Sequence, residues 1–381
     1  MSKKIILVTP FENRLAKRGT RFVDIANMLH EKGWKVIYIT SNFSHAYKRN
    51  FTREEIARET DSLPYPIKFI PIIGYSRNIS VRRVVSNLLM SYKIRNAVKR
   101  EAKDGDILLV PSRPVDLIYV LSRLENLKLA LDIRDTWPDA LPGKNIFFEI
   151  YCNFFLSRSL EAYQIFFHIS PSFTVWLNRY TKDKISTFVP PGFDSKRFPK
   201  NKLSRKSYDK IRLVFIGALQ YQLDILPLIK AIDNDTKYHL DIYGEDGKGQ
   251  RFKECNDYIQ SRSLTNISIK GVLEPDKVAG ILATYHVGVI PMITNSITNK
   301  MFDYIACGLP TMVIGHNDMS DFVLSYDVGW VTSFHHAEII SCLKNLNEKE
   351  ILKKAENLHL IREKFDRNVL YETIHEKLNS L

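Results

Sequence analysis

Short, continuous runs of apolar residues recur along this chain, and segments with helical periodicity lie between them. The runs of the first half are 5–8, 35–40, 67–72, 106–111, 128–133 and 167–170. Those of the second half are 211–217, 238–244, 267–271, 287–292, 309–315 and 328–333. Runs that do not alternate with polar residues are typical of strands buried on both faces of a parallel sheet. The pattern therefore predicts an α/β fold with doubly wound sheets.

The first connector supports this prediction. Phe22, Ile25, Ala26 and Leu29 fall at helical spacing, and Gly33 follows at the position of a C-cap glycine. Residues 1–40 are therefore expected to form one β-α-β unit.

A break near residue 190 divides the pattern. The two prolines and the glycine of residues 188–194 stop any regular element, and the strand and helix alternation restarts after residue 210. We expect a Rossmann-like domain at 1–190, a second at 191–365, and a C-terminal segment at 366–381. Ligands of open α/β sheets bind beyond the carboxyl ends of the strands, so two such domains facing across a cleft suggest a two-substrate enzyme.

The C-terminal segment is predicted to be a helix that packs on the first domain. Its apolar stripe consists of Val369, Leu370, Ile374 and Leu378.

The net positive charge of the chain is concentrated in the first domain. Lys and Arg total 55 against 42 Asp and Glu, and residues 1–100 hold 20 of the basic and 7 of the acidic side chains. No stretch approaches the roughly 20 apolar residues of a membrane span, and the run at 5–8 is too short for a signal peptide. The four cysteines show no paired spacing, which favours a reducing cytosol over a disulfide framework.

Residues 287–315 carry the most informative pattern. A strand ends near Pro291, a polar loop follows, and a helix begins near Lys300. The loop offers hydroxyl and amide groups from Thr294, Asn295, Ser296, Thr298 and Asn299. A helix N-terminus favours an anion, and Asp303, one turn into the helix, is placed to accept hydrogen bonds from a ribose. A solvated loop with an ordinary helix cap is the alternative that these residues leave open.

This segment resembles the donor-binding signature of retaining GT-B glycosyltransferases of the family 4 type. In that signature two glutamates flank seven residues, and a small residue, Gly, any residue and Pro follow. Asn295 and Asp303 occupy the glutamate positions here, and the ending is 306–310. The resemblance implies that Asp303 holds ribose hydroxyls, that Asn295 faces the sugar, and that Lys300 contacts the diphosphate. The string 299–304 is similar to a branch of these enzymes that assembles surface polysaccharides.

Other segments are similar to the same family in order and spacing. Residues 189–194 resemble its interdomain signature, and 215–217 its glycine-rich donor loop. Residues 243–247 resemble the strand and turn that follow, and 271–274 the loop that holds the base. The implied donor-binding residues are Gly217, Ala218, Gly244, Val272, Leu273, Ser296, Asn299, Lys300 and Asp303.

The chain also departs from the family pattern. Ala218 and Leu223 stand where the family often carries an Arg and a Lys that contact the diphosphate. The first loop, residues 9–20, has one glycine where two adjacent glycines are usual. Its basic residues include Arg14 and Arg18, which would contact an anionic acceptor or simply form a solvated basic loop.

In the first domain, residues 131–139 gather three carboxylates, an arginine and a tryptophan after a buried strand. The string resembles the Asp-x-Arg-Asp-x-Trp-Pro sequence of the same branch, which implies catalytic roles for Arg134 and Asp135 and acceptor contacts for Trp137. An ion pair between Arg134 and Asp135 is the competing interpretation. Arg113, at the end of the preceding strand, is a further acceptor candidate.

No metal or dinucleotide site is predicted. Asp233 and Asp235 match an Asp-x-Asp triplet but fall in a turn between a helix and a strand, and the glycines at 244–249 do not follow the dinucleotide fingerprint. No cofactor other than the nucleotide-diphosphate sugar as co-substrate is expected.

The resemblance implies a metal-independent retaining glycosyltransferase of the hexosyl or N-acetylhexosaminyl class. It would transfer sugar from the donor to a glycan or lipid-linked acceptor, at the inner face of the membrane. Two alternatives stay open: a nucleotide-sugar epimerase of the same fold, and a non-enzymatic basic adaptor that binds membranes. No nucleic-acid-binding module is visible.

The segment 79–103 is expected to dock on an anionic membrane. It combines basic side chains with an apolar stripe of Val81, Val84, Val85, Leu88, Leu89 and Tyr92. The stripe itself is expected to pack against the sheet.

Overall fold

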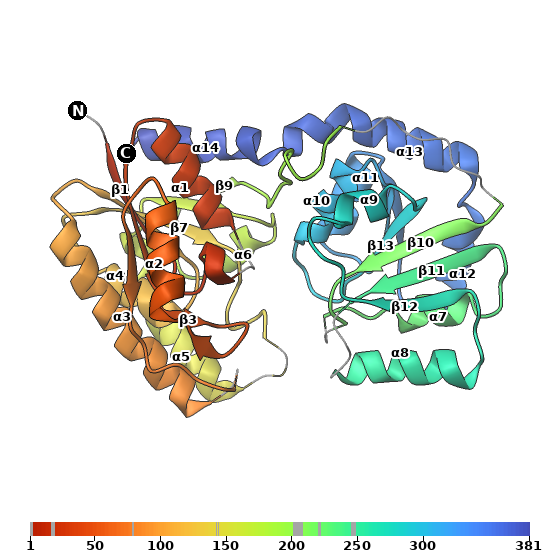
Figure 1. Ribbon diagram of the computed structural model, residues 1–381, viewed down its shortest axis with the longest axis horizontal. Helices are drawn as coiled ribbons and strands as arrows, with labels where there is room; N and C mark the ends of the chain where they lie inside the picture. The colour runs from red at the N-terminus through yellow and green to blue at the C-terminus, as the bar shows by residue number, and fades with distance from the viewer. Residues whose placement is uncertain are drawn as a thin grey trace. The chain divides into compact units, whose positions relative to one another are not determined.

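The computed structural model describes residues 3–16, 20–77, 80–141, 143, 145–200, 209–219, 222–244 and 249–381. The chain divides into two compact units, Met1–Val189 with Tyr371–Leu381, and Pro190–Leu370. Each unit is a parallel α/β sheet of the Rossmann type (Figure 1).

Unit 1 contains a seven-stranded parallel sheet of order β5-β2-β1-β6-β7-β8-β9. Its strands are β1 (Lys4–Val8), β2 (Lys35–Ser41), β5 (Ile67–Ile70), β6 (Ile107–Pro111), β7 (Lys128–Ile133), β8 (Ile165–His168) and β9 (Ser186–Phe188). A short antiparallel pair, β3 (Phe43–Ser44) and β4 (Arg49–Asn50), follows β2. The expected strand at 167–170 lies two residues earlier, because the side chains that reach the core there are Phe166 and Phe167.

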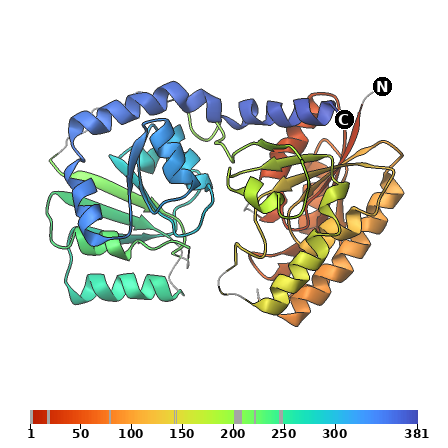
Figure 2. The same cartoon turned by 180° about the vertical axis from the view of Figure 1, so that it is seen from behind.

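Helices cover both faces of this sheet. On one side lie α1 (Arg21–Glu31) and α2 (Arg53–Ser62), and on the other α3 (Val81–Glu101), α4 (Val115–Leu121) and α5 (Ile146–Leu156) (Figures 1 and 2). The short helices are η1 (Arg14–Ala16), η2 (Leu160–Ala162) and α6 (Phe173–Leu177). The chain changes direction across the sheet between β1 and β6, so the loops after these two strands meet at a topological switch point.

Unit 2 contains a six-stranded parallel sheet of order β12-β11-β10-β13-β14-β15. Its strands are β10 (Ile211–Ile216), β11 (Tyr238–Tyr243), β12 (Ile267–Gly271), β13 (Val287–Pro291), β14 (Thr311–Ile314) and β15 (Gly329–Thr332). Helices α7 (Leu226–Ala231) and α8 (Gln250–Ser261) lie on one face, and α9 (Val278–Leu282), α10 (Asn299–Ala306) and α11 (Asp318–Ser325) on the other (Figure 1). The remaining helices are α12 (His336–Lys344), α13 (Glu348–Ile361) and η3 (Arg362–Phe365). The switch point of this sheet lies between β10 and β13.

The apolar runs form the two cores, as their continuity predicts. Ile5, Ile6 and Leu7 of β1 and Val287 and Val289 of β13 are fully buried. Each such side chain stabilises the fold by about 1.5–3 kcal/mol relative to an exposed one. The burial of these strands therefore strongly favours the two sheets.

The last helix, α14 (Arg367–Asn379), begins in unit 2 and continues in unit 1. Its buried side chains are Tyr371, Ile374 and Leu378, and the guanidinium of Arg21 lies 5.5 Å from the Tyr371 ring. Lys32 forms a 2.7 Å ion pair with Glu372. The expected stripe is wrong at Val369, which is 54% exposed, because Tyr371 supplies the apolar surface instead.

The expected packing of α3 is also corrected. Val81, Val85, Leu89 and Tyr92 face solvent, whereas Met90, Ile94, Ala97 and Val98 form the buried face. Spacing alone did not separate these two faces, because both carry apolar residues at helical intervals.

Candidate functional site: the switch points of the two sheets

Three glycine-lined strand ends form the base of the site in unit 2. The Gly217 amide, after β10, donates to the Tyr243 carbonyl at 2.7 Å, and the Gly244 amide, after β11, donates to the Gly271 carbonyl at 2.9 Å. A Cβ at Gly244 would lie 2.7 Å from the Gly217 oxygen. Both amides are therefore used within the sheet, and the absence of side chains at these strand ends lets other groups approach the backbone closely.

Lys300 lies directly against this base. Helix α10 carries it in the first turn, and its Nζ is so near Gly217 that a Cβ there would approach within 2.7 Å. The ammonium also lies 4.8 Å from the centre of the Phe215 ring. Burial lowers the pKa of Lys300 to about 8, and only Asp303 opposes that shift. The site thus holds a desolvated cation at the helix N-terminus, the arrangement that binds an anion.

Asp303 follows one turn later on α10. Burial raises the pKa of its carboxyl to about 6, although the charges of Arg197, Arg367 and Lys300 act in the opposite direction. A carboxylate that is desolvated but not neutralised is suited to accepting hydrogen bonds from hydroxyl groups.

Tyr304 fixes the position of α10. Its hydroxyl accepts from the Ile216 amide at 3.3 Å, and its ring lies so close to Gly288 that a Cβ there would be within 2.5 Å. Tyr304 is fully buried. The helix is therefore held on the sheet from the residue next to Asp303, which limits how far both charged side chains can move.

The polar side chains of the loop before α10 differ in their burial and hydrogen bonding. The Asn295 oxygen accepts from the Asp318 amide at 2.8 Å and so caps α11, which leaves the amide NH₂ of this exposed side chain for other contacts. Asn299 is exposed and Ser296 is half-buried. The hydroxyl of Thr294 is buried and has no hydrogen-bond partner within the described residues. Spacing did not single out Thr294 from its polar neighbours.

The other expected donor residues line strand ends of the same sheet. Ala218 follows Gly217, Val272 is 66% exposed after β12, and Leu273 is half-buried against the core. Residues 245–247 of the expected turn lie outside the described residues. The site residues of unit 2 therefore gather after β10, β11, β12 and β13.

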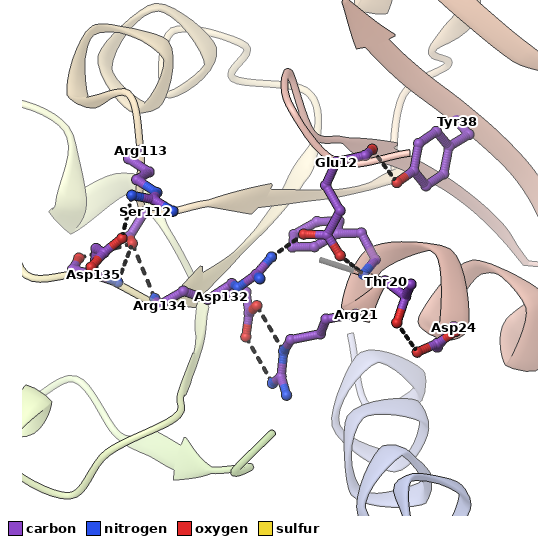
Figure 3. Close-up of polar contacts among 11 residues, drawn as sticks. Glu12, Thr20, Arg21, Asp24, Tyr38, Ser112, Arg113, Asp132, Arg134 and Asp135 are labelled. Atoms are coloured by element: carbon purple, nitrogen blue, oxygen red, sulfur yellow. Dashed lines mark hydrogen bonds and ion pairs between the residues drawn. The ribbon is translucent and has the colours of Figure 1, made fainter. Parts of the chain in front are cut away.

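One buried and one partly buried ion pair organise the switch point of unit 1. Arg21 donates to both oxygens of Asp132 at 2.9 Å. Arg134 pairs with Glu12, whose other oxygen accepts from the Phe22 amide at 2.8 Å (Figure 3). Burial alone would lower the pKa of Arg134, but Glu12 and Asp132 raise it above its ordinary value. Arg134 therefore stays charged.

The ion pair between Arg134 and Asp135, which was the competing interpretation, does not form. Asp135 pairs with Arg113 at 2.6 Å instead, while the Ser112 hydroxyl donates to the Asp135 carbonyl and accepts from the amides of Arg134 and Asp135 (Figure 3). Glu12 is the partner that the sequence did not reveal. The one sequence signal for Glu12 was its position in the loop after β1. Local spacing could not identify the ion pair, because Arg134 lies 122 residues away.

The expected acceptor residues lie in different surroundings. Trp137 is 6% exposed, its carbonyl accepts from the Trp176 indole at 2.9 Å, and Arg83 lies over its ring. Arg14 lies 3.8 Å from Glu59 and lines a surface cavity of about 420 Å³. Arg18 falls outside the described residues.

The Asp-x-Asp triplet is engaged in local contacts. Asp233 accepts from the Tyr258 hydroxyl at 3.0 Å and from Arg262 at 2.9 Å, and Asp235 accepts from the Lys237 amide. Within the described ranges, no group of three or more His, Cys, Asp or Glu side chains has the arrangement of a metal site.

Comparisons with known proteins concern the sequence of unit 2 and the fold. Residues 210–346 match the family described as glycosyl transferases group 1. No curated protein matches the sequence.

The fold as a whole is that of solved glycosyltransferases. Sucrose-phosphate synthase from Thermosynechococcus elongatus has a TM-score of 0.77 at 13% identity, over 99% of this chain and 98% of that one. Alr3699/HepE from Anabaena, solved with UDP and glucose, has a TM-score of 0.71 at 13% identity over 100% of both chains. A glycosyltransferase from Rickettsia africae gives 0.71 at 13% identity over 98% and 97%. The expected GT-B architecture, two Rossmann-like sheets, is confirmed.

Proposed function

We propose that this chain, a glycosyltransferase of group 1 with the GT-B fold, transfers sugar from a nucleotide-diphosphate sugar, with retention, to a glycan or lipid-linked acceptor of surface polysaccharide. One observation carries the proposal: the Lys300 ammonium lies against the bare backbone of Gly217 at the switch point of unit 2. A desolvated lysine, a glycine turn and a helix N-terminus together form a diphosphate site.

The donor would lie along the strand ends of unit 2. Lys300 and the N-terminus of α10 would hold the diphosphate beside Gly217, and Asp303 would accept hydrogen bonds from the ribose. Val272, Leu273 and Gly244 would surround the base, and the Asn295 amide would face the sugar. Because a similar structure contains UDP and glucose, UDP-glucose is the first donor to test.

Catalysis would consist mainly of stabilising the leaving group. As the glycosidic bond to the diphosphate breaks, negative charge grows on the diphosphate and positive charge on the sugar ring. Lys300 would stabilise the diphosphate, and no protein nucleophile is assigned. Arg134 is paired with Glu12, and Asp135 is paired with Arg113. These ion pairs support a role for Arg134 and Asp135 in positioning the acceptor.

A donor panel tests the proposal. Nucleotide sugars would be added to the full chain, and melting temperature and nucleotide release would be followed with and without a polyprenyl-linked glycan. Ligand at 100 times its dissociation constant stabilises a protein by about 2.7 kcal/mol, which a thermal shift detects. Release of nucleotide that needs acceptor supports transfer. Interconversion of the donor alone would indicate an epimerase, and the absence of any nucleotide binding would indicate an adaptor.

The surface of unit 1 formed by α3 and α5 supports docking on an anionic membrane, at the inner face where a lipid-linked acceptor would be presented. On α5, Ile146, Phe147, Ile150 and Phe154 are exposed, Phe147 at 81%. Asp116 of α4 accepts from Ser91 of α3 at 2.6 Å and from Tyr151 of α5 at 3.0 Å, so α4 joins these two helices.

Basic side chains surround the apolar ones. Arg82, Lys99 and Arg100 are exposed on α3, and the Arg158 guanidinium lies 4.1 Å from the Phe154 ring centre. Apolar side chains framed by cations are typical of interfacial helices, with about 1 kcal/mol per basic residue near an anionic leaflet. No helix in the described ranges is long and apolar enough to span a bilayer.

A further inference from the structure

Positively charged side chains gather around Tyr75 in unit 1, and one of them is Arg113, whose ion pair with Asp135 is drawn in Figure 3. Tyr75 is buried, and the Lys48 nitrogen and the Arg83 guanidinium carbon lie 5.1 and 5.3 Å from its ring centre. His45 completes the cluster, since its Nδ1 lies 2.6 Å from the Tyr75 hydroxyl and 3.3 Å from the Lys48 nitrogen.

The topology of the sheet places this cluster at a binding edge. His45 and Lys48 lie in the turn between β3 and β4, the hairpin that follows β2, whereas Tyr75 comes after β5 and Arg113 after β6. Arg83 lies in the first turn of α3, whose N-cap Ser80 accepts from the Arg83 amide at 3.2 Å. Three separate segments thus bring cations to the edge where open α/β sheets bind ligands.

Among the described residues, the carboxylates that act on the cluster are Asp116 and Asp135, and both already have partners. Asp135 is paired with Arg113, and Asp116 is buried in its hydrogen bonds to Ser91 and Tyr151. Burial, with the charges of Lys48, Arg83 and Arg113, lowers the pKa of His45 to about 3. Burial and Arg83 also lower the pKa of Lys48.

The histidine is therefore a neutral donor rather than a fourth cation. Because a hydroxyl and an ammonium both approach Nδ1, this nitrogen is the acceptor, and the ring proton belongs on Nε2. The cluster offers an ammonium, two guanidinium groups and one imidazole N–H. A carboxylate would be satisfied by one arginine fork, whereas a phosphate group, with a charge of about −1.5 to −2 and three oxygens, matches several cations.

We propose that this cluster, Lys48, Arg83 and Arg113 around Tyr75 and His45, binds a phosphate group of the acceptor. The inference rests on the proposed function in assigning the phosphate to the acceptor. Lys48 and Arg83 bind and orient the acceptor through its phosphate and take no part in bond breaking. A sugar phosphate and a lipid-linked diphosphate share this chemistry.

Inorganic phosphate is the first probe, added to the full chain with its donor site already saturated by UDP. We expect phosphate to raise the melting temperature of the wild-type protein. Lys48→Gln and Arg83→Gln should each weaken the apparent affinity for phosphate about ten-fold, since each removes a charge-assisted contact. Arg100→Gln, an exposed position on the same helix, is the matched control and should leave the affinity unchanged.

Competition then distinguishes the two sources of phosphate. A soluble hexose phosphate and a polyprenyl diphosphate in neutral vesicles would each be tested for displacement of inorganic phosphate, and displacement by one of them identifies the acceptor class. Displacement by neither, or equal phosphate affinity in wild type, Lys48→Gln and Arg83→Gln, overturns the inference. UDP binding in the same variants separates the two proposals: intact UDP binding leaves the donor site standing, whereas its absence from the wild type contradicts the proposed function itself.

Discussion

The ammonium nitrogen of Lys300 lies against the α-carbon of Gly217, where a single added methyl group would come within 2.7 Å of it. Gly217 also has a φ of +138°, which side chains rarely adopt. The pair joins the end of β10 to the start of α10 across the switch point of unit 2.

Gly217→Ala should therefore weaken donor binding strongly, with a smaller effect on the stability of the fold. The Cβ would displace Lys300 from the strand end and strain the backbone, so we expect donor affinity to fall at least about ten-fold. Isothermal titration with UDP measures this. Gly280→Ala is the matched control, because no atom lies within 4 Å of its Cβ and it should bind donor like the wild type. Equal affinity in both variants would mean that Lys300 does not act from this position.

Removing either charged side chain of α10 should weaken donor use with the fold intact. Asp303→Ala loses hydrogen bonds to ribose and Lys300→Ala loses a partner of the diphosphate, each worth roughly 1.5–3 kcal/mol, or about ten-fold or more in kcat/KM. Steady-state kinetics on protein with an unchanged circular dichroism spectrum provides the measurement. Unchanged kinetics for Asp303→Ala would refute the donor-site assignment.

Donor affinity should be greatest between about pH 6 and pH 8. Lys300 has a pKa of about 8 and loses its charge as the pH rises through that value, so diphosphate binding weakens. Asp303 has a pKa of about 6 and becomes protonated as the pH falls through that value, so it accepts fewer hydrogen bonds from ribose. The dissociation constant of UDP, measured across this range, should rise on both sides. Lys300→Met should remove the alkaline limb and Asp303→Asn the acidic one.

Without ligand, the same two groups predict the opposite pH dependence for the free energy of unfolding, which should be lowest where donor affinity is greatest. The pKa of Asp303 is raised, so its contribution to folding is present below its ordinary value of 3.8 and is lost as the pH rises toward 6. The pKa of Lys300 is lowered, so the unfolded chain binds more protons between about 8 and 10.5, and stability rises with pH there. Asp303→Asn and Lys300→Met should flatten these two slopes in urea unfolding.

Turnover is predicted to survive EDTA. The expected diphosphate site relies on Lys300 and backbone N–H groups, and Asp233 is held by Tyr258 and Arg262. Activity should therefore be equal with EDTA and with added manganese, and Asp233→Asn should behave like the wild type. Loss of turnover in EDTA with recovery in manganese alone would contradict this site.

The protein should co-sediment with anionic vesicles because unit 1 binds to them. Replacing Lys99, Arg100 and Arg123 by Gln removes exposed charge beside the apolar side chains, and about 1 kcal/mol per residue should be lost. Phe147→Ser with Ile150→Ser should weaken binding as well. The control replaces Lys253, Lys344 and Lys349, which are exposed on helices of unit 2. Equal binding to neutral vesicles, or equal loss in the control, would argue against docking through α3 and α5.

Local sequence patterns are sufficient to predict the two sheets and the order of the segments in the donor motif. Continuous apolar runs have few ways to bury both faces, so nearly every expected strand forms, and Gly217, Lys300 and Asp303 belong to local strand-to-helix patterns. The pairing of the charged side chains, by contrast, depends on how the chain folds in three dimensions. Arg134 pairs with Glu12 rather than with its neighbour Asp135, and His45, Tyr75 and Arg83 converge from two loops and the first turn of α3. Such contacts depend on which strands are adjacent in the sheet, and no local spacing encodes that adjacency. The outer face of α3 followed the same rule, since the sheet selected one of its two apolar faces and left the other to solvent.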